Sequence, residues 1–130
     1  MTIEFSADTS KLQSDLKKVE AASKKTANEL KAIDNGLKFN PGNVTLLKQK
    51  FDALKQSVKQ SEERLNTLKA KQKAMDASGV DKTSAEYREL QREIIKAENQ
   101  LDRAKKKLRE FGNVPIQKVQ TLNHKIVLLY

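Results

Sequence analysis

The stretch "LKFNPGNVTLLKQKFDALK", residues 37–55, joins two segments of helical character through the tetrapeptide Asn40-Pro41-Gly42-Asn43. A proline disfavours helical backbone angles at the residue before it, so we expect the first helix to end by Phe39. Asn40 is then predicted to cap the second helix, with Pro41 at its first position, where the missing N–H costs nothing. In that arrangement Phe39 and Val44 would form a hydrophobic staple.

The apolar pattern continues in phase across this break. Leu37 and Val44 stand seven residues apart, which is one coiled-coil repeat. In an isolated chain we favour a hairpin corner at this point, because the two helices can then bury each other's apolar stripes. A kinked rod that continues in one direction is the alternative, and it stays open. The segment Phe39 to Val44, including Gly42, is therefore a predicted hinge and helix cap.

Working outward from the hinge, apolar residues recur at alternating spacings of three and four residues in three segments. They predict helices over 9–39, 41–77 and 84–111. Although 33% of all residues are charged, no charged residue falls on the stripe, and a repeat of 3.5 residues is typical of helices that supercoil around a partner. The predicted coiled-coil seam consists of Leu12, Leu16, Val19, Leu30, Ile33, Leu37, Leu47, Phe51, Leu54, Val58, Leu65, Leu68, Met75, Leu90, Ile94, Leu101 and Leu108. The same stripe contains the polar residues Ser23, Thr26, Ser61 and Gln72, which weaken the core and are expected to fix its register.

The ends of these helices carry signals of their own. Alternating polar and apolar residues over 2–5 predict a short extended arm, residues 1–8, before the first helix. Ser10 with Gln13 fits a capping box at the start of that helix, and Thr83 with Glu86 fits one for the third helix. Between the second and third helices, residues 78–82 form the second predicted break.

The last segment, residues 113–130, loses the heptad pattern and is predicted to be an irregular tail. The fold class that follows is all-α. We expect three long helices that form antiparallel coiled-coil hairpins or a bundle, preceded by the short extended arm and followed by the tail.

Composition argues against catalysis and against cofactor, metal or small-molecule binding. The chain of 130 residues contains no cysteine and a single histidine, His124, which falls in the predicted tail. A lone histidine without cysteines is a poor metal site or general base, and no glycine-rich phosphate loop is present. No run of about 18 apolar residues occurs, so no membrane span is predicted. We therefore expect a protein that is not an enzyme.

The net charge of +9 raises the question of nucleic acid. Lysines cluster at 17–18, 24–25 and 105–107, but many have acidic neighbours at helical spacing. Neither a recognised nucleic-acid module nor aromatic residues interleaved with the basic ones are visible. We interpret the charge as a solvated or protein-contacting coiled-coil surface. Non-specific phosphate contact is the alternative, and no sequence-specific binding is expected.

Two stretches carry a family resemblance. "FSADTSKLQSDLKKVE" (residues 5–20) and "LKFNPGNVTLLKQK" (residues 37–50) resemble the N-terminal region of phage tail tape measure proteins. The run "REIIKAENQLDRAKKKLREFG" (residues 92–112) follows in the same order, so the resemblance covers about residues 3 to 114. Members of this family are long helical proteins in the tails of siphophages and of related prophages, especially those of Gram-positive bacteria. They normally span many hundreds of residues, so the chain is expected to be a segment of such a protein.

The resemblance implies a structural role in phage tail assembly. Copies of a tape measure protein associate with tail chaperones, and tail tube protein polymerises around them, so that the chain length sets the tube length. The expected partners are therefore copies of the chain itself, through coiled-coil pairing, together with tail tube and tail chaperone proteins. The expected location is the host bacterial cytoplasm during assembly and then the lumen of the virion tail. A generic coiled-coil interaction module and a basic helical protein that contacts nucleic acid are the alternatives.

Overall fold

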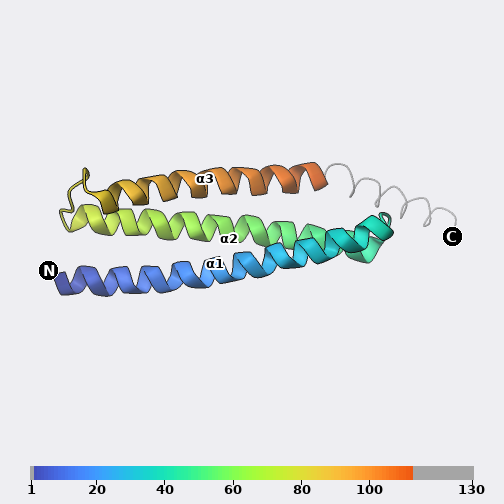
Figure 1. Cartoon of the computed structure of the whole chain (residues 1–130), viewed down its shortest axis with the longest axis horizontal. Helices are drawn as coiled ribbons and strands as arrows, with labels where there is room; N and C mark the ends of the chain where they lie inside the picture. Colours follow the sequence, from blue (N-terminus) through green and yellow to red (C-terminus); the bar gives the residue numbers. More distant parts are fainter. Residues whose placement is uncertain (1, 113–130) are drawn as a thin grey trace.

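The computed structural model describes residues 2–112, and side-chain surroundings from Ser10 onward. Three helices account for nearly all of this part of the chain (Figure 1): α1 (Thr2–Phe39), α2 (Val44–Ala77) and α3 (Ala85–Phe111). Within the described residues there is no β-strand, so the all-α prediction is confirmed. The predicted tail, with His124, lies outside the described residues.

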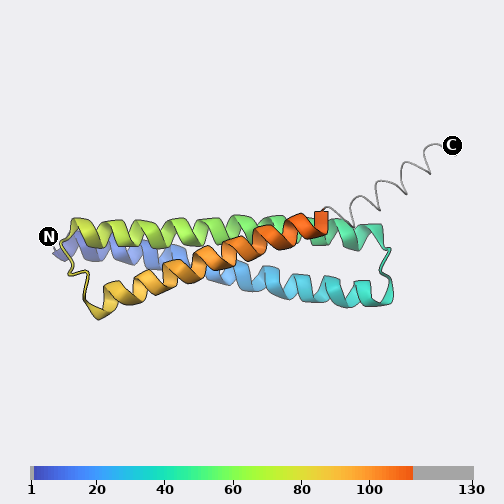
Figure 2. The same cartoon turned by 90° about the horizontal axis from the view of Figure 1, so that it is seen from above.

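The chain reverses direction at both connections. The helix α2 runs back beside α1, and α3 runs back beside α2 (Figures 1 and 2). The middle helix packs closely against both of the others, whereas α1 and α3 hardly touch. The three helices therefore form a layer that has α2 as its central member.

The predicted extended arm over residues 1–8 is wrong, because α1 begins at Thr2. Ser10, the predicted cap, lies inside α1 rather than at its start. Four alternating residues are a weak strand signal. Neither glycine nor proline occurs between Thr2 and Asn35, and extending an existing helix by one residue costs far less than starting one.

The first connection also differs from the prediction at its cap. The side chain of Asn43, not that of Asn40, accepts a hydrogen bond from the backbone N–H of Leu46 at 3.0 Å, and α2 begins at Val44. The Asn43 N–H donates to the Asn40 carbonyl at 3.1 Å. Residues 40–43 thus form a four-residue turn with Pro41 at the second position, which proline favours. Proline belongs to the turn, and the second asparagine takes over the cap.

The predicted hydrophobic staple is wrong for the same reason. Phe39 is 92% exposed and Val44 is 37% exposed, so these side chains do not bury each other. Shifting the cap by three residues moves Val44 from the fourth helical position to the first, where no staple forms. The end of α1 at Phe39 is as the proline predicted.

Gly36 has a packing role near this corner. A Cβ atom at Gly36 would lie 2.9 Å from Cδ1 of Leu46, closer than such atoms normally approach. The sequence pattern favours a helix-forming residue at this position. The missing side chain instead leaves room for Leu46 of α2 to pack against the backbone of α1.

The second connection begins with a glycine-dependent helix end. Gly79 has a φ of +72°, and its N–H donates to the carbonyl of Asp76 at 3.1 Å. The N–H of Val80 donates to the carbonyl of Met75 at 3.0 Å, which completes a Schellman motif. Val80 also packs against the core cluster. The reversal is therefore held both by hydrogen bonds and by a buried apolar contact.

The start of α3 uses a different cap from the predicted one. Ser84, not Thr83, is the N-cap, and its hydroxyl accepts from the N–H of Tyr87 at 3.3 Å. Asp81 binds Thr83 instead, accepting from its N–H and its hydroxyl, both at 2.8 Å. These two hydrogen bonds lower the pKa of Asp81 below its ordinary value of 3.8. A short-range turn thus outcompetes the capping box.

Candidate assembly surface

Eight of the seventeen predicted seam residues are buried and the other nine are half-buried. None of them is exposed, and Leu68 of α2 is the most deeply buried, at 1% exposure. A core cluster extends from Leu65 on α2 to Leu101 on α3 and includes Tyr87 and Ala97, with Leu16 and Val58 packed on it. By contrast, the predicted hinge residues Phe39, Asn40, Pro41, Gly42 and Val44 are all exposed, and Asn43 between them is half-buried.

Of the polar seam positions, Thr26 is buried at 8% exposure, while Ser23, Ser61 and Gln72 are half-buried. These four residues lie in the middle of the three-helix layer and between its middle and the second turn. Ser23 and Ser61 line one hollow together with the charged residues Glu20 and Arg64.

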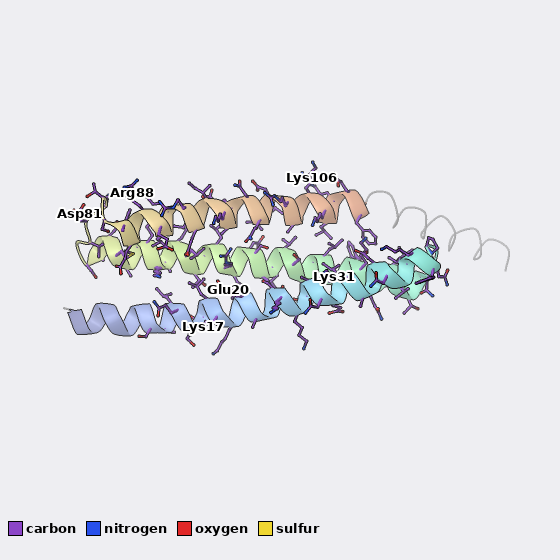
Figure 3. All side chains as sticks on the ribbon, viewed as in Figure 1. Lys17, Glu20, Lys31, Asp81, Arg88 and Lys106 are labelled. Carbon is purple, nitrogen blue, oxygen red and sulfur yellow. The ribbon has the colours of Figure 1, made fainter. Side chains whose placement is uncertain are left out.

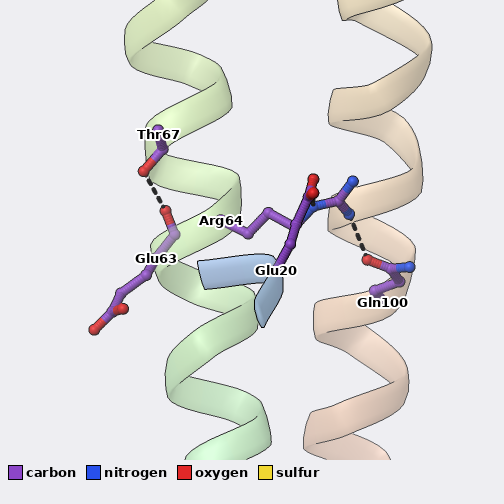
Figure 4. Close-up of polar contacts among 5 residues, drawn as sticks. All are labelled: Glu20, Glu63, Arg64, Thr67 and Gln100. Atoms are coloured by element: carbon purple, nitrogen blue, oxygen red, sulfur yellow. Dashed lines mark hydrogen bonds and ion pairs between the residues drawn. The ribbon is translucent and has the colours of Figure 1, made fainter. Parts of the chain in front are cut away.

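One such charged group joins all three helices at the centre of the molecule (Figure 4). Arg64 of α2 donates from Nη1 to Oε1 of Gln100 on α3 at 2.6 Å. Its Nε lies 3.8 Å from Oε1 of Glu20 on α1, and the arginine side chain is only 20% exposed. A single guanidinium group therefore connects the two outer helices through the middle one.

A second junction of the same kind lies two heptads nearer the first turn. Nζ of Lys50 is 2.8 Å from Oδ1 of Asp34 on α1, and it stands 5.2 Å from the ring centre of Phe111 on α3. The acidic members are fourteen residues apart on α1 (20 and 34), and the basic members are fourteen apart on α2 (50 and 64). These junctions therefore repeat with the period of the heptad.

Sequence reasoning missed both junctions because it treated charged residues as a solvated surface. A usable signal was nevertheless present. If the chain reverses about Gly42, positions equally distant from Gly42 face each other, and this places Asp34 opposite Lys50 and Glu20 opposite Arg64. The hairpin alternative thus predicts two opposite-charge pairs, whereas the rod alternative predicts neither.

The central junction leaves some of its polar groups unpaired. Nε of Arg64 and Oε1 of Gln60 are buried without a hydrogen-bond partner among the described residues. Burying a charge with incomplete pairing costs free energy that an apolar pair would not. The arrangement nevertheless disfavours a shift of the helices along one another, because a shift would leave the guanidinium group unpaired.

An open groove follows the layer on the face where α1 and α3 do not meet, and we call it the trough. It is hollowed at three places, each lined by residues of all three helices. The α2 residues that line it are Lys50, Leu54, Ser57, Ser61, Arg64, Lys71 and Met75, spaced mostly by three or four residues. Since that spacing defines one stripe of a helix, the three hollows lie along a single face. A layer with such a groove has the form of a bundle that lacks one helix.

The two ends of the trough differ in charge. Near the second turn its lining includes Glu86, Glu89 and Glu93 of α3 together with Lys71 of α2. Near the first turn the lining includes the ammonium groups of Lys31, Lys50 and Lys107, with Asp34 and Glu110 beside them, and the apolar side chains of Leu30, Leu54 and Phe111. We call these the acidic end and the basic end.

The remaining basic residues mostly face outward (Figure 3). Arg88 and Lys106 project from the outer edge of α3, and Lys17 projects from the outer edge of α1. Lys106 lies 4.0 Å from Glu110 of the same helix, so part of this charge is paired locally. The outer edges are thus charged and solvated, in contrast to the apolar seam.

In the part of the chain that the structure describes, no three histidine, cysteine, aspartate or glutamate residues are placed to hold a metal ion. None of the described helices combines the length and the apolar character that a membrane span requires. Comparison with known proteins found no matching family model, no matching curated protein and no matching solved structure.

Proposed function

We propose that this protein is a structural assembly module whose helices associate as antiparallel coiled-coil pairs, and that it serves as an N-terminal segment of a phage tail tape measure protein. The observation that carries the assembly role is the seam: uncharged residues follow one stripe on each helix, and none of the predicted seam residues is exposed. Side chains so arranged stabilise helix pairing.

The more specific identity has a different support. It rests on the resemblance of residues 5–20, 37–50 and 92–112 to tape measure proteins. In this role the module would act with tail chaperones and tail tube protein in the host cytoplasm, and then inside the tail.

The identity is tested on virions. The genes beside the coding sequence should include tail tube and tail chaperone genes, and mass spectrometry of purified, induced phage particles should detect peptides of this chain. Deleting the coding sequence should give particles without tails of normal length. Absence of the peptides from tailed particles of the same strain would rule out the tape measure proposal and leave the generic coiled-coil module.

The nucleic-acid alternative has a separate test. A phosphate-binding function predicts DNA binding that survives moderate salt and falls linearly with the logarithm of salt concentration. The outward-facing Arg88 and Lys106 would take part. Binding that disappears near physiological salt would assign these charges to solubility alone.

A further inference from the structure

We infer that the trough is a docking surface for a second copy of this chain, placed in the opposite direction about a two-fold axis near Arg64. The inference deepens the proposed assembly function, on which it rests, by naming the partner and the surface. Its evidence is the shape of the layer and the distribution of charge along it.

The shape comes first. Because α1 and α3 both pack on α2 and hardly on each other, the layer leaves three separate hollows along one face, with the fully buried Leu68 between the central hollow and the acidic one. A second copy laid over this face would cover all three. At the basic end the hollow is lined partly by Leu30, Leu54 and Phe111, of which Leu54 and Phe111 are already buried within the chain, so charge contributes more than apolar surface to what a partner could contact there.

Charge selects the partner and its direction. The acidic end presents three carboxylates and one ammonium group, and the basic end presents three ammonium groups and two carboxylates. A two-fold axis across the middle of the trough sets the acidic end of each copy against the basic end of the other. Complementary potentials of this kind fix orientation and disfavour the parallel arrangement, which would place the acidic ends together.

The centre of the trough suits such an axis. Its lining is Ser57 and Ser61 of α2 with Arg64, Gln100, Glu20 and Ser23. The hydroxyl groups of serine can both donate and accept, so the same residues can pair with themselves across a two-fold axis. Arg64 already donates a hydrogen bond to Gln100 and lies 3.8 Å from Glu20 within its own chain, so its charge is partly paired before any partner binds, although its Nε makes no hydrogen bond.

The test is sedimentation equilibrium on the full chain. We expect the wild type to form dimers. Reversing charge at the acidic end (Glu86→Lys with Glu89→Lys) and, in a second protein, at the basic end (Lys31→Glu with Lys107→Glu) should each weaken the homodimer about tenfold or more, since attraction becomes repulsion at both symmetric contacts. These four side chains are exposed, so the fold should tolerate the changes.

Mixing the two variants should restore association as a heterodimer, and combining all four changes in one chain should restore the homodimer. The matched controls change net charge equally outside the trough, at exposed positions: Glu62→Lys with Glu98→Lys, and Lys59→Glu with Lys96→Glu. The controls should dimerise like the wild type. The chain has no natural cysteine, so Ser61→Cys should form a disulfide between copies near the axis.

Three results overturn the inference: a wild type that stays monomeric at millimolar concentration, a trimer or larger closed species, or dimers that the trough variants and the controls weaken equally. Each is independent of the proposed function, because detection of the chain in virions does not depend on this surface. A monomer found in tails would remove the trough dimer alone, and a dimer absent from tails would remove the tape measure role alone.

Discussion

Leu68 is the side chain whose removal should cost this fold the most. It is 1% exposed in the C-terminal half of α2 and belongs to the core cluster that joins α2 to α3. Leu68→Ala removes the equivalent of about three methylene groups, worth about 2.4 kcal/mol of transfer free energy. Helices held on both sides of α2 can collapse only partly into the space, so the cavity adds about 1 kcal/mol. We expect a loss of about 3–4 kcal/mol.

A loss of this size is a large fraction of the total free energy of unfolding. A domain of this size has a free energy of unfolding of about 5–15 kcal/mol. The assay is urea unfolding followed by circular dichroism at 222 nm, at one fixed protein concentration, because association would make the apparent stability depend on concentration. Two matched variants calibrate it. Leu108→Ala makes the same chemical change at a half-buried site and should cost less, and Phe39→Ala, at 92% exposure, should stay within about 0.5 kcal/mol of the wild type.

The reasoning fails if Leu68→Ala costs less than about 1.5 kcal/mol, which is below the usual range for a buried leucine. It also fails if Phe39→Ala costs as much as Leu68→Ala, because the predicted difference rests on burial alone. A changed dependence of the unfolding free energy on urea would instead mean that the variant altered the unfolded or native ensemble.

Three further outcomes follow from named contacts. Leu54→Asp places a charge in the buried seam. The variant should lose most of its helical circular dichroism signal at room temperature, because burying an unpaired charge is costly. Unchanged helicity would contradict the packing of α1 and α3 on α2. Arg64→Glu should lower the free energy of unfolding by about 2 kcal/mol, and adding Glu20→Arg should recover about 0.5–1 kcal/mol of it. A double-mutant cycle measures this recovery as a coupling free energy. A coupling of zero would mean that the ion pair at 3.8 Å contributes nothing to stability. The Tyr87 hydroxyl donates to Oδ1 of Asp76 at 2.8 Å, and that hydrogen bond raises the pKa of Tyr87 above 10.0. The stability that this hydrogen bond contributes is therefore complete below pH 10 and is lost as the pH rises through the folded-state pKa of Tyr87. Unfolding midpoints measured from pH 8 to 11 should fall at high pH in the wild type, and they should fall less in Tyr87→Phe.

The heptad pattern and the helix breakers account for most of the fold that could be predicted. A stripe without charge in a chain rich in charge locates the buried face of each helix, and Pro41 and Gly79 locate the two reversals. These signals are strong because each has a single physical cause: a charge cannot be buried cheaply, and proline and glycine restrict or free the backbone. They depend little on which residues lie nearby in space.

The helix caps could not be predicted, because neighbouring residues of similar capping strength compete for the same position. Asn40 and Asn43 are both good caps, and Thr83 and Ser84 both carry a hydroxyl. The outcome depends on which of them the turn geometry leaves free. The trough likewise depends on how α1 and α3 are placed around α2, and an individual stripe does not contain that information. The glycine at position 36 could not be explained from the sequence either, because it makes room for the side chain of Leu46 on another helix.

The folded layer places a condition on any role as a ruler. At 1.5 Å per residue, α1, α2 and α3 would together measure about 150 Å end to end, whereas the layer is about as long as α1 alone, about 57 Å. Opening the two turns therefore gains length but separates α2 from both partners and uncovers the seam along all three helices. An extended form is stable only if other chains cover that seam, so a ruler made of this segment must contain several copies with their helices in register. The turn at residues 40–43 is where that exchange would begin, because none of its four residues is itself buried. The hinge can thus serve both arrangements, with the seam paired within one chain in the folded layer and between chains in the rod.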